Sequence, residues 1–272
     1  MRVMEPTGNP PEQTGNQADE VTRAAVDTVA EASELAGEDT SKEVVLRRRA
    51  LRRVTARLGM AIAAGARRGA NVTGRGVTSG SKWLSGQVLT MAPRLPVRDL
   101  ATLRGQYPDR TPDQIADALI EGASRASATV GVAVGAWSVL PWVPAIGVEV
   151  ATETLSVVGV EIKLVAELHE VYGMRAPGSV IDRMTAYVGA WASRRGVALA
   201  PGGLVLVAGS PLARQLQRRL AARAGRSVFS LGPLLTGAVA GGLLNRRETR
   251  KLGRILRDDL RARSPFAEGW LD

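Results

Sequence analysis

Apolar residues recur at helical spacing along most of this chain. In the segment 41–64 they lie three, four or seven residues apart, at Val44, Leu51, Val54, Leu58 and Ile62. Arginines occupy the opposite and flanking faces, and Ser41 stands where a helix N-cap is expected. The pattern predicts a basic amphipathic helix over this segment.

A helix start is marked by Thr111, Pro112 and Gln114. A threonine cap, a proline at the first helical position and a glutamine three residues after the cap form a capping box. No charged residue occurs from 126 to 148, and two prolines interrupt this run. We therefore expect a helix, a break in WSVLPWVP, and a second helix from about Ala145 to Tyr172 that ends at Gly173.

The other periodic segments also indicate helices. A short helix is expected around 81–91, followed by Pro93 and Pro96. A helix over 178–195 would face inward with Val180, Met184, Tyr187, Val188 and Trp191. An apolar segment over 197–209, an arginine-rich helix over 211–225 and an apolar segment over 227–245 follow. A final helix over 245–263 would carry one stripe of Leu252, Ile255, Leu256 and Leu260. The predicted fold class is an all-α multi-helix bundle with Gly/Ala-rich apolar helical hairpins, and every element is expected to be helical.

Charge divides the chain into three regions. Residues 1–40 are polar and acidic, and they are expected to form a disordered tail in which a weak helix over 18–36 is compatible with the sequence. Residues 41–98 hold the basic amphipathic helix and a Gly-rich connector, and 99–265 hold the helical domain. The whole chain has a net charge of +10, so acidic partners are expected.

Two uncharged runs, 126–148 and 227–245, could cross a bilayer or close a core. Each contains two glycines at GxxxG spacing, Gly131 with Gly135 and Gly237 with Gly241, where helix backbones can approach closely. A spanning helix needs about 20 apolar residues. Because prolines shorten the uninterrupted pieces, a packed core is favoured over a span.

Tryptophans and acids flank the predicted break. Trp137 and Trp142 fit a bilayer interface, and they fit equally the gaps that glycine and alanine leave in a protein interior. Glu149 and Glu153 follow on the second helix and argue against deep lipid burial there. We expect these two carboxylates to face solvent.

Four segments together resemble the EcsC family of bacterial proteins. They are TPDQIADALIEGASRAS, the apolar Gly/Ala helix that ends at a proline break, the long helix that closes with ELHEVYG, and GPLLTGAVAGGLLNRRETRKLGRIL. The resemblance covers roughly 110–262. It implies an all-helical, membrane-associated protein with no established reaction, and it assigns no catalytic residue.

The sequence offers little chemistry for catalysis. Cysteine is absent, and GRGVTSGSKW over 74–83 lacks the spacing of a phosphate loop. The one histidine, His169, cannot form a zinc site with other histidines. Near a helix C-terminus its protonated form would be favoured by the helix dipole. No catalytic, cofactor-binding or metal-binding residue is predicted.

Arginine-rich helices give the functional hypothesis. The residues expected at an anionic surface are Arg47, Arg48, Arg52, Arg53 and Arg57, and further arginines follow in 214–226 and 246–263. The predicted partner is an anionic membrane surface or a membrane protein. Nucleic acid is not favoured, because aromatic residues for base stacking are absent from these helices.

The sequence thus predicts a non-enzymatic, membrane-associated or lipid-contacting protein. It would be cytoplasmic, peripheral to or embedded in the cytoplasmic membrane, and not secreted, because the first residues form no apolar signal. Two alternatives stay open. One is a soluble helical scaffold or partner-binding module with its apolar hairpins buried, and the other is an enzyme that uses the carboxylates of Glu149, Glu153 and Glu161.

Overall fold

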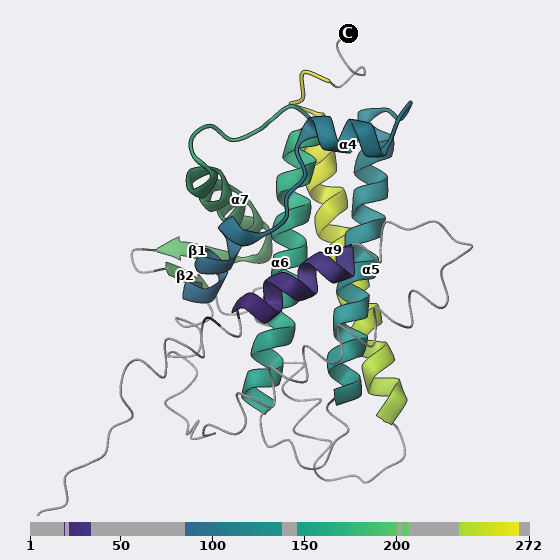
Figure 1. Ribbon diagram of the computed structural model, residues 1–272, viewed down its shortest axis with the longest axis vertical. Coiled ribbons are helices and arrows are strands. Elements are labelled where there is room, and N and C mark those ends of the chain that lie inside the picture. The colour runs from purple at the N-terminus through teal and green to yellow at the C-terminus, as the bar shows by residue number, and fades with distance from the viewer. Residues whose placement is uncertain are drawn as a thin grey trace, which may run out of the picture.

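Three long helices form the body of the protein. The computed structural model describes residues 19, 22–33, 85–137, 146–200, 203–206 and 234–266. In Figure 1, α5 (Pro112–Trp137), α6 (Ile146–Val171) and α9 (Leu234–Arg261) run alongside one another, and each packs against the other two. The predicted all-α multi-helix bundle is confirmed.

Smaller elements surround α6, which lies at the centre. α7 (Val180–Arg195) and the short α4 (Leu100–Gln106) pack against it. A helix at 22–33 crosses it, and a helical segment at 85–91 continues into η1 (Ala92–Arg94). From 153 to 168 every side chain of α6 is buried. A helix covered on all sides must be apolar on most of its faces, which explains its run of valines and leucines.

Local signals set the helix ends as predicted. The amide of Gln114 donates to Thr111 Oγ1 at 3.3 Å, and the amide of Thr111 donates to Gln114 Oε1 at 3.0 Å, so the capping box is confirmed. Gly173 adopts the left-handed conformation (φ +67°) just after α6. A second capping box, Ser179 with Asp182, opens α7.

The segment after α7 departs from the helical expectation. Strand β1 (Val197–Ala200) pairs antiparallel with β2 (Gly203–Leu206), and Val197 lies opposite Leu206. The prediction that every element is helical is therefore wrong here. Two short apolar runs separated by Pro201 and Gly202 are a hairpin signal, and they are too short for a stable helix.

The acidic N-terminal region contributes a helix to the core. Residues 22–33 form a helix whose Ala25, Val29 and Ala32 are fully buried. This helix lies within 18–36, where the sequence was compatible with a weak helix in an otherwise disordered tail, but its burial was not expected. The region as a whole is polar and acidic, but it contains a short apolar stripe at helical spacing. This stripe packs against α6 at Gly159, where the absence of a side chain leaves room for Val29.

Three details of the helical faces were also predicted wrongly. Segments 227–245 and 246–263 were expected as separate elements, but α9 runs through both. Val180 and Ile255 were expected to face inward, yet 53% and 47% of their surfaces are exposed. Both lie at the edge of an apolar stripe, where spacing alone does not decide burial.

Among the described helices, none combines the length and apolar character needed to cross a membrane.

The contact between α5 and α9 depends on two glycines. A Cβ on Gly131 would lie 3.1 Å from the backbone of Gly242, and one on Gly242 would lie 3.0 Å from the Ala128 carbonyl oxygen. The close approach therefore uses Gly242 rather than the predicted Gly241, around which nothing lies within 4 Å of an added Cβ. We call the contact of Gly131 with Gly242 the glycine seam.

Gly242→Ala is expected to lower the free energy of unfolding by about 1–3 kcal/mol, because the helix backbones must separate to admit a methyl group. Gly241→Ala is the matched control. It fills open space and replaces glycine by the better helix former, so it should raise stability by up to about 1 kcal/mol. Urea unfolding followed by circular dichroism measures both, and equal effects of the two variants would contradict the glycine seam.

Candidate functional site

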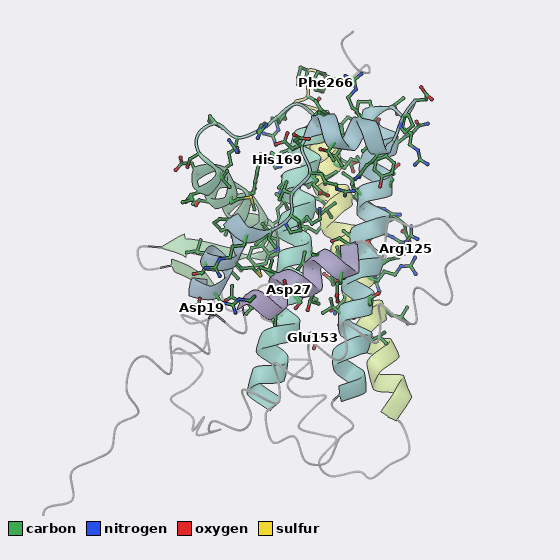
Figure 2. The ribbon with its side chains drawn as sticks, in the orientation of Figure 1. Asp19, Asp27, Arg125, Glu153, His169 and Phe266 are labelled. Carbon is green, nitrogen blue, oxygen red and sulfur yellow. The ribbon has the colours of Figure 1, made fainter. Side chains whose placement is uncertain are left out.

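The central helix α6 carries a column of buried charged side chains. Figure 2 shows Glu153 toward one end of the described column and His169 toward the other. Burial of an ionised group is costly unless it is paired and hydrogen-bonded. The buried charged side chains of α6 are Glu153, Glu161, Lys163, Glu167 and Glu170.

Glu161 joins four helices. Arg195 of α7 donates through Nε to Glu161 Oε2 at 3.0 Å and also forms an ion pair with Oε1, while Trp191 Nε1 donates to Oε2 at 2.9 Å. From α9, the Thr249 hydroxyl lies 3.0 Å from Glu161 Oε1 and 2.9 Å from the Ser127 hydroxyl of α5. We call these five residues the Glu161 cluster.

The direction of each hydrogen bond in the Glu161 cluster follows from which groups can only accept. A carboxylate only accepts, so Thr249 donates its hydroxyl proton to the hydrogen bond with Glu161 and accepts a hydrogen bond from the Ser127 hydroxyl. Burial disfavours the charge of Arg195, but the carboxylates of Glu161 and Glu248 outweigh that effect and raise the pKa of Arg195. The buried Glu161 carboxylate and the partly exposed Glu248, 3.3 Å from Arg195 Nη1, therefore both pair with one buried guanidinium at the helix junction.

Glu167 forms a second cluster one and a half turns further along α6. Arg98, in the segment that connects η1 with α4, donates through Nε to Glu167 Oε1 and through Nη2 to Oε2, both at 2.8 Å. Its backbone amide reaches Oε1 at 3.2 Å. Lys163, one helical turn before Glu167, also forms an ion pair with Oε1. We call Arg98, Lys163 and Glu167 the Glu167 cluster.

Charge is not balanced in the Glu167 cluster, because two cations share one carboxylate. Burial acts to raise the pKa of Glu167, but Arg98 and Lys163 lower it overall. The pKa of Lys163 is lowered overall. Burial and the charge of Arg98 both lower it, and the carboxylate of Glu167 only partly offsets them. Lys163 is thus the surplus cation of the cluster.

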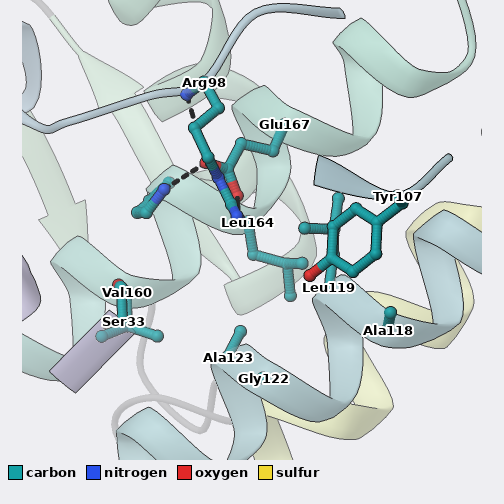
Figure 3. A pocket seen from close by; sticks show the side chains of 11 residues that line it. Ser33, Arg98, Tyr107, Ala118, Leu119, Gly122, Ala123, Val160, Leu164 and Glu167 are labelled. Carbon is teal, nitrogen blue, oxygen red and sulfur yellow. Dashed lines mark hydrogen bonds and ion pairs between the residues drawn. The ribbon is translucent and has the colours of Figure 1, made fainter. Parts of the chain in front are cut away.

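A small cavity lies beside the Glu167 cluster. It has a volume of about 40 Å³ and is lined by α5, α6, the end of the 22–33 helix, Arg98 and Tyr107 (Figure 3). Its polar lining comes from Ser33, Arg98, Tyr107, Lys163 and Glu167. In this cavity, buried charged groups adjoin space that an occupant can enter.

His169 does not behave as the helix dipole predicts. Its Nδ1 lies 2.7 Å from the Val165 carbonyl oxygen, and its ring packs 5.0 Å from that of Tyr187. Burial lowers the pKa of His169, and the charges of Arg263 and Arg194 lower it further. The expectation of a favoured protonated imidazole is therefore wrong, because the cost of burying the charge exceeds the attraction of the helix end.

Several residues predicted for a site lie beyond what the structure describes. Arg47, Arg48, Arg52, Arg53, Arg57 and Trp142 fall outside the described residues. Gly135 and Trp137 lie in the last turns of α5, Gly237 in the first turns of α9, and Glu149 in the first turn of α6, where only the backbone is described.

Glu153 does not face solvent as expected. It is buried, and Asn245 Nδ2 of α9 lies 3.4 Å from its Oε1. The sequence analysis did not identify Arg98, Lys163 or Arg195 as partners of buried carboxylates. For Lys163 and Glu167 a signal was present in EIKLVAELHE, where charges interrupt a helix that is otherwise apolar on most faces, whereas Arg98 and Arg195 lie outside this segment.

Comparisons and metal geometry add no assignment. No family model, no curated protein and no solved structure matches this chain. The resemblance to the EcsC family therefore stays a prediction. Within the described ranges, no three His, Asp or Glu side chains gather as they would around a metal ion.

The Glu161 cluster should dominate stability. Glu161→Gln removes the buried anion of Arg195 and leaves it only the partly exposed Glu248, 3.3 Å from Nη1, so we expect a loss of about 3–5 kcal/mol in the free energy of unfolding. The double variant Glu161→Gln/Arg195→Met also removes the buried cation and should recover part of that loss. Chemical denaturation measures each variant.

An exposed ion pair provides the control for this experiment. Asp259→Asn disrupts the pairs of Asp259 with Arg194 and Arg263, which are partly exposed, and should cost less than about 1 kcal/mol. If Glu161→Gln costs no more than Asp259→Asn, the Glu161 cluster does not hold the helices together.

His169 should make stability depend on pH. Its folded pKa lies below the ordinary value of 6.5, so the unfolded chain binds the proton more readily and stability falls as the pH drops below 6.5. His169→Gln should remove this part of the slope. Glu170 acts in the opposite direction, because burial raises its pKa.

Proton NMR tests the cause directly. The chain has one histidine, so the imidazole resonances are unambiguous. Their titration midpoint should lie below 6.5, and a midpoint above that value would overturn the burial argument.

Proposed function

We propose that this protein is non-enzymatic and binds anionic membrane surfaces through the outward face of α9. The observation that carries the proposal is a stripe of cations, Arg247, Lys251 and Arg254, spaced four and three residues apart and all exposed. We call these three residues, with Leu243 and Ile255, the α9 stripe.

The cations of the α9 stripe differ from the other arginines of the same helix. Arg246 and Arg250 pair with Glu121 of α5, Arg257 with Asp117, and Arg261 with Asp113. The three stripe cations form no ion pair with any described residue. Acids along α5 neutralise one side of α9, and the charge of its other side remains available to an external anion.

Apolar side chains accompany these cations. Leu243 is 60% and Ile255 47% exposed at the two ends of the α9 stripe. Helices that lie in a membrane interface combine exposed aliphatic groups with lysine and arginine in this way. Each cation near an anionic lipid surface contributes about 1 kcal/mol, so the three supply about 3 kcal/mol before the aliphatic contacts are added.

The buried carboxylates support a structural role rather than catalysis. Both oxygens of Glu161 accept hydrogen bonds from Arg195, Trp191 or Thr249, and those of Glu167 are held by Arg98 and Lys163. Groups engaged in this way join helices and present no open face to a substrate. An EcsC-like, membrane-associated protein without a reaction agrees with this arrangement.

Vesicle binding tests the α9 stripe. The triple variant Arg247→Gln/Lys251→Gln/Arg254→Gln should bind vesicles of phosphatidylcholine and phosphatidylglycerol about a hundredfold more weakly, since about 1 kcal/mol is lost per charge. Co-sedimentation measures the partition coefficient. Vesicles of phosphatidylcholine alone should bind both proteins equally weakly.

A matched control has the same net charge but keeps the stripe. Arg94→Gln/Arg104→Gln/Arg110→Gln removes three exposed cations from other elements, and it should retain most of the binding. Equal losses in the two triple variants would show that only total charge matters. Unchanged binding in the stripe variant would reject α9 as the contact.

A further inference from the structure

We propose that the cavity beside the Glu167 cluster binds a small monovalent anion, of the size of a halide or formate ion. This inference is independent of the α9 stripe. It starts from the charge of the cluster, where Arg98 and Lys163 carry two positive charges and Glu167 one negative charge. One positive charge is therefore left over in a site where the Lys163 side chain is only 7% exposed.

Glu167 has little capacity left to compensate this charge. Its Oε1 accepts from the backbone amide and Nε of Arg98 and from Lys163, and its Oε2 accepts from Arg98 Nη2 at 2.8 Å. The remaining guanidinium nitrogen of Arg98, Nη1, donates to Gln106 at 2.7 Å. The carboxylate and the guanidinium thus satisfy each other, and the surplus charge resides on Lys163.

Lys163 has hydrogen-bond donors that no described residue accepts. An ammonium group has three N–H donors. Among the described residues, Glu167 is the one hydrogen-bond partner of Lys163. Because Lys163 lines the cavity, an occupant there can accept from it.

The cavity has the size and lining for such an occupant. One water needs about 10–15 Å³ of this kind of volume, so about 40 Å³ admits an ion of a few atoms. Tyr107 adds a hydroxyl donor, and Figure 3 shows its oxygen directed inward near Leu119. The apolar part of the lining includes Ala123, Val160 and Leu164.

An anion fits this site better than water because the uncompensated charge is buried. Water can accept hydrogen bonds from Lys163 but leaves the surplus charge in place, whereas a monovalent anion removes it. A divalent anion would replace the surplus positive charge by a negative one. The charge count therefore selects a single negative charge, and the volume selects a small ion.

Thermal unfolding in different sodium salts at equal ionic strength tests the site. Chloride, bromide and formate should raise the melting temperature saturably, by about 2–4 °C relative to gluconate, which is too large to enter. Lys163→Met should abolish the difference between the salts. Lys251→Met, which removes an exposed lysine of α9, is the control and should retain it.

A second variant keeps the charge but removes the space. Ala123→Leu fills the cavity and should also abolish the difference between the salts, while Lys163 stays in place. Crystals grown in sodium bromide should show anomalous scattering within hydrogen-bond distance of Lys163 Nζ. Equal melting temperatures in bromide and gluconate, or the absence of that bromide peak, would overturn the proposal.

Discussion

The structure depends on the pairing of Glu161 with Arg195 at the centre of the bundle. Glu161 is buried on the helix that every other long helix touches. Trp191 and Arg195 of α7 and Thr249 of α9 donate to it, and Thr249 also bonds the Ser127 hydroxyl of α5. A buried carboxylate that lost any of its donors would cost free energy. The rotations of α7 and α9 about their axes are therefore restricted to those that point their donors at Glu161, and α5 is tied to the same point through Thr249.

Close backbone contact and buried charge act together in this arrangement. The glycine seam brings α9 near enough to α5 for Thr249 and Asn245 to reach the polar groups around Ser127. If larger residues replaced the two glycines of the seam, their side chains would push the helices apart and those hydrogen bonds would lengthen. Apolar packing supplies the attraction between the helices, and the polar contacts select one register from the many that small side chains permit.

The sequence predicted features that have a local cause. The Thr111 capping box and the turn at Gly173 follow from a few neighbouring residues, so both could be recognised. Lys163 and Glu167 also lie one turn apart, but in a sequence such a pair resembles an ordinary surface ion pair. Its burial depends on Arg98, 69 residues from Glu167, and that of Glu161 depends on Arg195, 34 residues away. Spacing along one helix contains no information about such partners.

The two groups of arginines in this protein follow from the same electrostatic rule. The inward guanidinium groups of Arg195 and Arg98 each have a carboxylate opposite them, because an unpaired charge in the interior costs free energy of folding. On α9 the constraint applies only to the side that faces α5, where Asp113, Asp117 and Glu121 meet the arginines. The outward cations Arg247, Lys251 and Arg254 are exposed and form no ion pair with any described residue, so solvation by water suffices for them and folding requires no acid opposite them. Their charge therefore costs the fold little.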